Sequence, residues 1–249
     1  MKDGYLVRLC LITMISVLTV ISPQAADHDA TLVHTEAEHR VHSQFEALFV
    51  SVTEQLANRQ QMYIDNPVAY YDFLMATVVA SWDSASTSRA LVGKQHYTGF
   101  NDAQRLILVE SVDQTLIRYA FEGLESYGGQ VFKVDDVVVN EEKGMGWVQV
   151  LMESPILPDI NLDLVIKRNL NNQWHAVDVR VKGITYVKIK KYKYREIIEE
   201  QGFDALIDNL TTKNTNYFGA VCAQAVNTEQ KGRAPCWAKP PLVPLGPSL

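Results

Sequence analysis

Three histidines near the start of the chain come closest to a metal-binding pattern. His34, His39 and His42 do not have the HExxH spacing of a zinc-binding helix, and no cysteine or pair of carboxylates completes a ligand set. His175 and Asp178 are three residues apart in a strand-like run, so their side chains project from opposite faces and cannot form a catalytic pair there. No GxSxG, P-loop or GxGxxG motif stands at a strand-to-helix junction. We therefore expect no metal ion and no cofactor.

The N-terminus has the pattern of a secretory signal peptide. A basic start is followed by an apolar run over residues 9–21 and by the small residues Ala25 and Ala26. The alternative is an uncleaved membrane anchor, but the run is shorter than the roughly 20 residues that a spanning helix needs. We expect residues 1–25 to be a cleaved signal peptide and the protein to be exported to the periplasm.

The overall charge argues against nucleic acid as a partner. The chain of 249 residues has a formal net charge of -6, and such a balance repels phosphate. With 47% hydrophobic and 21% charged residues, it has the composition of one or two ordinary globular domains.

The first half of the chain carries helical patterns. The apolar stripe over residues 41–56 predicts an amphipathic helix, and residues 26–40 before it are expected to form a flexible segment. The Asn-Pro pair at 66–67 favours the start of a second helix. Asn101, with Gln104 three residues on, predicts the capped start of a longer one.

From Gln130 the apolar period changes from about 3.6 to 2. Short, turn-rich segments separate the runs, so neighbouring runs should pair as antiparallel strands. Leu162, Leu164 and Ile166 point one way while Asp163 and Lys167 point the other, which leaves one apolar sheet face for the helices to cover. The pattern predicts an α+β fold: a four-stranded antiparallel sheet wrapped by a preceding helical segment and following short helices. The four predicted strands are 131–139, 146–153, 161–167 and 174–181.

The composition changes after Leu210. We expect the main domain to span residues 41–210, and residues 211–249 to form a linker and a proline-rich tail. Export would leave Cys222 and Cys236 as an even pair of cysteines in an oxidising compartment. A disulfide between them would staple this tail and contribute about 3 kcal/mol; two unrelated thiols are the alternative.

Apolar and aromatic residues gather where the long helix meets the sheet, among them Tyr97, Leu116, Tyr119 and Leu124. A packed core is the commonest place for such residues. A cavity lined by several of them is the alternative.

From about Asn66 to Leu210 the chain resembles the MlaC, or toluene-tolerance (Ttg), family of periplasmic phospholipid-binding proteins. The resemblance lies in the stretches "LVGKQHYTGFNDAQRLILVESV" (91–112), "YGGQVFKV" (127–134), "WHAVDVRVKGITYV" (174–187) and "IIEEQGFDALIDNL" (197–210). The positions that match the family pattern are Leu91, Gly93, Gln104, Arg105, Trp174, Asp178, Val179, Gly183, Gly202, Leu206 and Leu210.

The resemblance implies a cone-shaped α+β fold with an apolar cavity for the acyl chains of a glycerophospholipid. Proteins of this family are not enzymes. They carry lipid between an outer-membrane lipoprotein and an inner-membrane ABC transporter, which helps to maintain outer-membrane lipid asymmetry. The residues expected to line the cavity are Tyr97, Leu116, Tyr119, Leu124, Val150, Leu164, Ile166 and Val179.

Two other classes remain open. A small-molecule enzyme on the same cone-shaped fold would need a titratable group with a shifted pKa inside the apolar pocket. A binding module for another protein would have a solid core instead.

The stretch "GITYVKIKKYKYREII" (183–198) concentrates positive charge on an acidic chain. Its alternation would suit a fifth strand, but the family pattern favours a helix capped near Thr185. On that helix Lys188, Lys191 and Arg195 form one positive stripe. A solvated face is one interpretation; docking to an acidic partner or to anionic headgroups is the other.

Overall fold

The computed structural model describes residues 35–156, 158–224 and 232–236, which belong to one compact unit, His34–Leu249. The predicted signal peptide, residues 1–25, and most of the predicted flexible segment lie outside the described residues. The helices in chain order are α1 (Glu36–Asp65), α2 (Pro67–Ala76), the 3-10 helix η1 (Val79–Ser81), α3 (Ser84–Val92), α4 (Lys94–Gly99), α5 (Asp102–Glu125), α6 (Tyr186–Gln201) and α7 (Phe203–Gln224). The strands between α5 and α6 are β1 (Val131–Asn140), β2 (Met145–Glu153), β3 (Ile160–Arg168), β4 (Trp174–Val181) and β5 (Ile184–Thr185).

The first helix begins earlier than its apolar stripe predicts. Residues 36–40 are helical, which corrects the C-terminal end of the flexible segment predicted over 26–40. The physical reason is a capping box. The Thr35 hydroxyl accepts a hydrogen bond from the backbone N–H of Glu38 (3.2 Å), and the Glu38 carboxylate accepts one from the N–H of Thr35 (2.7 Å).

The other two predicted helix starts are confirmed. The Asn66 side chain accepts a hydrogen bond from the N–H of Ala69 at the start of α2 (3.0 Å). At the start of α5, the Asn101 side chain accepts from the N–H of Gln104 (2.8 Å), and the Gln104 side chain accepts from the N–H of Asn101 (3.0 Å). These polar pairs fix where α2 and α5 enter the domain.

The sheet has strand order β1-β2-β3-β4-β5, and all neighbours are antiparallel. The four predicted strands are confirmed. The sheet has five strands rather than four, because the two residues of β5 pair with the end of β4 as a short antiparallel edge strand. The pairs are Arg180↔Thr185 and Val181↔Ile184. This short strand leads the chain directly into α6.

A register shift between β3 and β4 changes which side chains face the core. The shift falls between Val165 and Ile166. It places Ala176 and Trp174 on the same face as Val179, against Leu164 and Ile166. On the other face, Asp178 pairs with Val165 and contacts the first turn of α6, which leaves it only 8% exposed. A strict alternation of two residues cannot predict such an irregularity.

The lysine-rich stretch 183–198 is mainly a helix. The Thr185 hydroxyl caps α6 by accepting a hydrogen bond from the N–H of Lys188 (3.1 Å). The helix ends at Gly202, whose φ of +89° suits a residue without a Cβ.

The last helix continues through the predicted linker. α7 runs to Gln224, so residues 211–224 are helical, which corrects the start of the tail predicted over 211–249. Asn214 and Phe218 are buried against α5, and this packing extends the helix beyond Leu210. In the final described segment, Cys236 forms a disulfide with Cys222 of α7.

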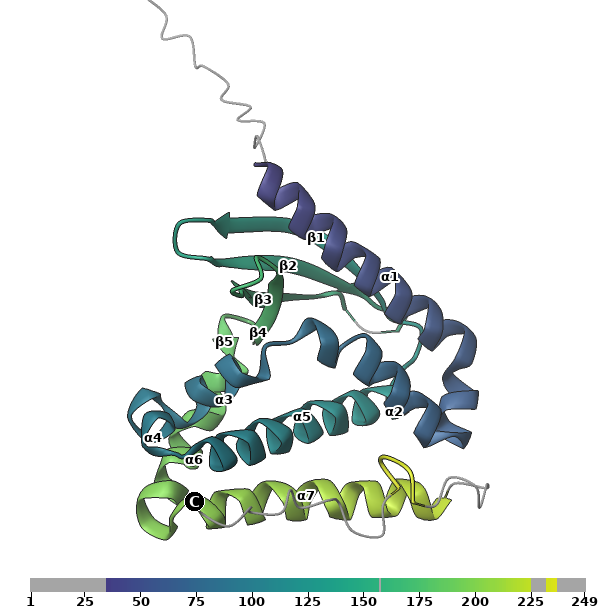
Figure 1. The fold of residues 1–249 in the computed structure, drawn as a ribbon. Coiled ribbons are helices and arrows are strands. Elements are labelled where there is room, and N and C mark those ends of the chain that lie inside the picture. Colours follow the sequence, from purple (N-terminus) through teal and green to yellow (C-terminus); the bar gives the residue numbers. More distant parts are fainter. Residues whose placement is uncertain (1–34, 157, 225–231, 237–249) are drawn as a thin grey trace, which may run out of the picture. The chain divides into compact units, whose positions relative to one another are not determined.

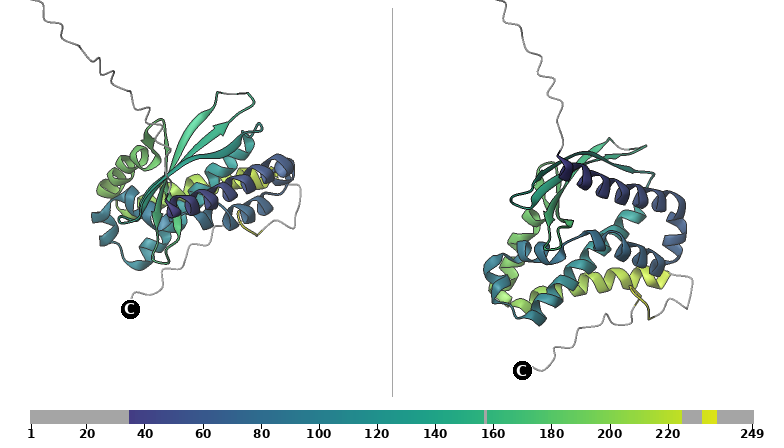
Figure 2. Two further views of the ribbon diagram at one scale, coloured as in Figure 1. Left: turned by 90° about the horizontal axis from the view of Figure 1, so that it is seen from above. Right: turned by 45° about the horizontal axis from the view of Figure 1, so that its top comes forward.

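The buried apolar residues form three clusters. Figure 1 shows α1 beside the sheet, and Figure 1 and the right-hand view of Figure 2 show α5 and α7 side by side, apart from the sheet. The sheet cluster joins α1 to the strands and comprises Val41, Phe45, Val137, Val148, Val150, Leu164, Ile166, Trp174 and Ala176. The α6 cluster comprises Leu91, Val92, Phe100, Leu108, Val112, Tyr194, Ile197, Leu206, Ile207 and Leu210. The tyrosine cluster comprises Leu56, Tyr63, Tyr70, Tyr71, Leu74, Ile117, Phe121, Leu124 and Phe218.

Candidate functional site: an apolar cavity beside a polar pocket

An apolar cavity of about 150 Å³ lies between α1, the segment around η1 and the sheet. Its walls are almost entirely hydrocarbon. The ten lining residues are Phe45, Leu48, Phe49, Val52, Val78, Ser81, Trp82, Phe132, Leu164 and Ala176.

The amphipathic stripe of α1 supplies one wall of this cavity. Four residues of α1 line the cavity at spacings of three, one and three residues, so they project from one side of the helix. They are Phe45, Leu48, Phe49 and Val52. Phe49 stacks on Phe132 of β1, with ring centroids 6.0 Å apart. The same periodicity that builds α1 therefore presents an apolar surface to the sheet.

The segment around η1 supplies the opposite wall. It is held to β4 by the backbone N–H of Asp83, which donates to the carbonyl oxygen of Ala176 (2.8 Å). The Trp82 indole N–H donates to the Thr87 hydroxyl (2.8 Å), which in turn donates to the carbonyl oxygen of Val177 (2.7 Å). These bonds satisfy the polar atoms of the wall and leave hydrocarbon facing the cavity.

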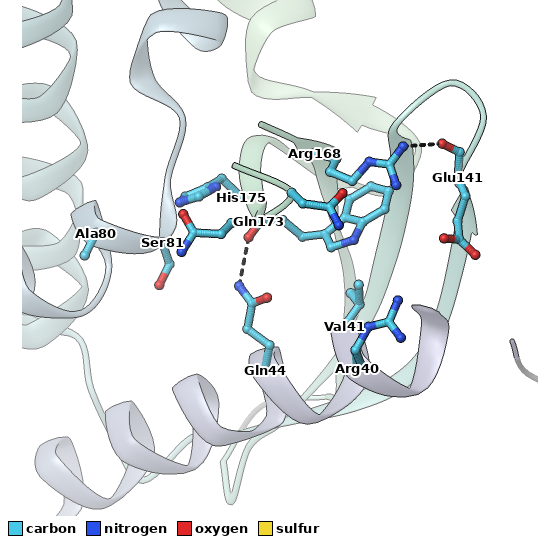
Figure 3. Close-up of a pocket in the computed structure, with 11 residues that line it drawn as sticks. Arg40, Val41, Gln44, Ala80, Ser81, Glu141, Arg168, Gln173 and His175 are labelled. Atoms are coloured by element: carbon cyan, nitrogen blue, oxygen red, sulfur yellow. Dashed lines mark hydrogen bonds between the residues drawn. The ribbon is translucent and has the colours of Figure 1, made fainter. Parts of the chain in front are cut away.

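A larger polar pocket of about 340 Å³ adjoins the apolar cavity. The two spaces share Ser81 and use neighbouring positions of α1 and β4. Figure 3 shows Arg40 and Gln44 on α1 at one side of this pocket, with Arg168 and His175 at the opposite side. An apolar space next to a polar one matches the two parts of an amphiphile.

The polar pocket is lined by two arginines, Arg40 and Arg168, and by the acidic residue Glu141; of the two cations, Arg168 is the one without an ion pair among the described residues. Its guanidinium lies 5.7 Å from the ring centroid of Trp174 and donates to the carbonyl oxygen of Glu141 (2.6 Å). In the part of the chain that the structure describes, no carboxylate forms an ion pair with Arg168. Arg40, by contrast, pairs with Glu36 (2.8 Å).

Polar groups at the pocket wall add hydrogen-bonding capacity. The Gln44 amide N–H donates to the carbonyl oxygen of Trp174 (2.8 Å), which fixes the side chain at the wall. The His175 Nδ1 atom is buried and has no hydrogen-bond partner among the described residues. A buried polar atom of this kind is costly unless something binds it.

The residues predicted to line a cavity are distributed over all three clusters. Leu164 lines the apolar cavity. Its predicted companions on the sheet, Val150 and Ile166, belong to the same cluster, and Val179 packs against it. The four predicted helix residues lie elsewhere: Tyr97 and Leu116 pack on the α6 cluster, Leu124 belongs to the tyrosine cluster, and Tyr119 lies edge-on to Tyr186.

Four of the nine lining residues that the prediction missed lie on α1. The stripe over 41–56 was recognisable as one face of a helix, but nothing in its spacing showed that this face, rather than that of α5, would cover the sheet. The pairing of a helix with a sheet depends on tertiary packing, which local periodicity does not record.

The predicted positive stripe on α6 is incomplete. Lys188 and Lys191 are exposed. Arg195 is half-buried and lies across Gly93: a Cβ added to that glycine would be 2.6 Å from the guanidinium. Gly93 therefore gives Arg195 room to lie between α3 and α6, and the arginine does not extend the stripe into solvent.

Ionisable groups with raised pKa values lie outside the apolar cavity. Burial raises the pKa of Asp113, although a hydrogen bond from the Ser84 hydroxyl opposes the shift. Burial also raises the pKa of Glu110, and the neighbouring Asp113 adds to it. No ionisable side chain lines the apolar cavity in the described structure.

The described ranges contain no cluster of three or more His, Cys, Asp or Glu residues that could hold a metal ion. The same ranges contain no helix with the length and hydropathy needed to cross a bilayer.

The fold and the cavity together define an α+β protein in which a long N-terminal helix, the segment around η1 and an antiparallel sheet line a partly open apolar space. The chain belongs to the MlaC family, since the family model described as MlaC protein matches residues 46–212, about two thirds of its length. The resemblance noted from the sequence motifs is thereby confirmed.

A solved structure gives the same fold. The phospholipid-binding protein from Ralstonia solanacearum, in complex with a phospholipid, matches with a TM-score of 0.59 at 14% sequence identity. The match covers 74% of this chain and 99% of that chain. At this identity the similarity establishes the fold alone. A comparison with curated proteins gives no match.

Proposed function

We propose that this protein is a periplasmic phospholipid carrier and not an enzyme. It would move glycerophospholipid between the outer and inner membranes, with an outer-membrane lipoprotein and an inner-membrane ABC transporter as partners. Membership of the MlaC family and the phospholipid bound to the Ralstonia protein support this function. The observation that carries it is the apolar cavity beside a polar pocket that contains Arg168.

The energetics of lipid transfer require such a cavity. Burial of a methylene contributes about 0.8 kcal/mol, so a chain of ~15 methylenes loses on the order of 12 kcal/mol when it is exposed to water. A carrier must therefore enclose the acyl chain. Transfer from the apolar bilayer to an apolar cavity is nearly neutral, which allows release.

The cavity must enlarge to take a whole acyl chain. Its volume of about 150 Å³ is below the ~300–1,000 Å³ of typical ligand pockets. The wall formed by Leu48, Phe49 and Val52 belongs to a single helix, so an outward shift of α1 would widen the cavity. The shift would leave the strand pairings intact, but it would break the hydrogen bonds that Glu46 and Glu38 accept from the backbone of β1 (3.0 and 3.2 Å). We propose that the acyl chains enter between α1 and the sheet and that the headgroup lies in the polar pocket.

The apolar lining also bears on the alternative of a small-molecule enzyme. General acid–base catalysis needs an ionisable group within hydrogen-bonding reach of the substrate. The carboxyls with raised pKa values are Asp113 and Glu110 on α5 and Asp178 on β4, and none of them is among the lining residues. The cavity therefore supports binding better than it supports chemistry.

We expect glycerophospholipid to co-purify with the protein. Leu48→Trp should fill the cavity and lower the recovered lipid at least about fivefold, because the added indole occupies the volume that an acyl chain would take. Solvent extraction followed by mass spectrometry measures the lipid recovered per protein.

Leu106→Trp is the matched control, since Leu106 is 55% exposed and lies outside the cavity. Equal lipid recovery from the two variants would show that this cavity does not hold the acyl chains. Absence of lipid from the unmodified protein after mild purification would contradict the carrier function itself.

Arg168→Gln tests the placement of the headgroup. The unmodified protein should bind a phospholipid about tenfold more tightly than a diacylglycerol with the same chains, because a charge-assisted hydrogen bond to phosphate is worth about 1.5–3 kcal/mol. The variant should lose most of this preference while it still binds diacylglycerol. Competition between the two lipids measures the preference, and Lys143→Gln, at an exposed position outside the pocket, controls for net charge. An unchanged preference in Arg168→Gln would place the phosphate elsewhere.

A further inference from the structure

The N-terminal half of α6 carries an amphipathic exposed surface that the lipid cavity does not use. At about 100° per residue, five side chains cover roughly 200° of the helix circumference. Their order around the helix axis is Lys191, Lys188, Tyr192, Ile189 and Lys193. Ile189 is 61% exposed and Tyr192 is 76% exposed. Two large apolar side chains thus lie in solvent between lysines on both sides.

Most of the positive charge on this surface is uncompensated. Lys193 pairs with Glu196 (2.7 Å), and Lys190 lies 5.9 Å from the ring centroid of Tyr186. Within the described ranges, no carboxylate forms an ion pair with Lys188 or Lys191. The acidic residues of α6 lie in its C-terminal half, where Glu199 contacts His96 (3.3 Å), so the positive charge is concentrated near the start of the helix.

A pocket of about 230 Å³ lies beside this surface, where α6 meets α5 and α7. Lys190, Lys193 and Lys213 contribute to its lining, together with Ile189 of the exposed face. Arg118, also in the lining, is already engaged by Glu122 and by the Asn214 side-chain oxygen (3.1 Å). Since Lys193 pairs with Glu196, the charges available for an anion are those of Lys190 and Lys213.

This combination fits a bilayer surface better than a protein surface. A stable protein interface buries about 800 Å² per partner around an apolar centre, whereas only two apolar side chains project here. Lysines around an exposed apolar and aromatic pair are typical of helices that lie at a membrane interface. A phosphate group is also small enough for the adjoining pocket.

We propose that α6 docks the protein on the surface of an anionic phospholipid bilayer. Ile189 and Tyr192 insert among the headgroups, Lys188 and Lys191 face the lipid phosphates, and the pocket lined by Lys190 and Lys213 receives one headgroup phosphate. The proposal does not depend on the lipid cavity, because α6 and its pocket share no lining residue with it.

Vesicle co-sedimentation of the protein as purified from its expressing cells tests this proposal. Vesicles of phosphatidylcholine mixed with phosphatidylglycerol should bind it at about 0.1 M salt and release it at about 1 M, where the Debye length falls from ~10 Å to ~3 Å. Vesicles of phosphatidylcholine alone should bind it at least about tenfold more weakly, since each lysine near an anionic surface changes the partition coefficient about fivefold.

Three variants separate the contributions. Lys188→Gln/Lys191→Gln should weaken binding to the anionic vesicles at least about tenfold, and Lys213→Gln about fivefold. Ile189→Ser/Tyr192→Ser should weaken it about tenfold even at low salt, because insertion of apolar area is lost. Lys133→Gln/Lys143→Gln on the β1–β2 hairpin makes the same change in net charge and should leave binding unchanged.

Equal binding to the two kinds of vesicle, or equal loss in the hairpin control, would overturn the proposal. Binding to neither vesicle would also overturn it and would leave this face to an acidic protein. The α6 variants should keep their co-purified lipid, and Leu48→Trp should keep its vesicle binding. Failure of docking is therefore distinguishable from failure of the carrier function.

Discussion

Phe45→Ala should lower the free energy of unfolding by about 3–5 kcal/mol, the usual cost of removing a buried phenyl ring. Phe45 is fully buried where α1 meets the sheet, and it belongs to the same cluster as Val148 and Ile166. For a chain of this size the melting temperature should fall by about 6–20 °C. Urea denaturation followed by circular dichroism measures the change.

Phe45→Leu is the matched control, since it keeps most of the apolar volume and should cost less than about 1.5 kcal/mol. A loss below about 1 kcal/mol in the alanine variant would mean that α1 contributes little to the stability of the sheet. In that case α1 would not be a structural wall of the lipid cavity.

Asp178→Ala should destabilise the protein by about 2–4 kcal/mol. Asp178 is 8% exposed, and its Oδ1 atom accepts hydrogen bonds from the backbone N–H groups of Val179 (2.9 Å) and Val187 (3.2 Å). The alanine variant leaves both donors without this acceptor, and an unsatisfied buried donor costs about 1–3 kcal/mol. Because Val187 is in the first turn of α6, the variant should also loosen that turn, which increased hydrogen exchange of its amides would show.

Asp178→Asn separates the charge from the hydrogen bonds. Burial raises the pKa of Asp178 above its usual value near 3.8, although the backbone N–H groups of Val187 and Val179 partly oppose this shift. The folded state then binds the carboxyl proton of Asp178 more tightly than the unfolded state does. Asp178 therefore stabilises the folded protein at pH values below its pKa in the unfolded state, and this stabilisation is lost as the pH rises through its pKa in the folded state.

The asparagine variant should lack this dependence. Its stability relative to the unmodified protein should be highest near neutral pH and should decline as pH falls toward about 4. Urea titrations at several pH values measure the difference. A difference independent of pH would show that the carboxyl titrates alike in the folded and unfolded states.

Local sequence patterns predicted most of the secondary structure. The change of period near Gln130 located the four long strands, and the Asn101–Gln104 pair located the start of α5. Both signals involve residues close in sequence, so a single chain contains all the information that they need.

The features that were not predicted depend on contacts between distant residues. The first turn of α6 covers Asp178, the space at Gly93 accommodates Arg195, and burial of Asn214 extends α7. Each requires a partner from another element. The assignment of cavity residues to α5 rather than α1 has the same origin, because both helices carry apolar stripes and only the folded chain shows which one covers the sheet.

The division of the core into three clusters bears on how this sequence can change. The sheet cluster and the α6 cluster have no buried residue in common, and substitutions at separate sites usually combine additively. Selection could therefore change the size of the apolar cavity beside α1, for longer or shorter acyl chains, without changing the exposed lysines of α6. It could equally change those lysines without changing the cavity. Asp178 and the short strand β5 join these two regions, so this junction is where the chain has least freedom to vary.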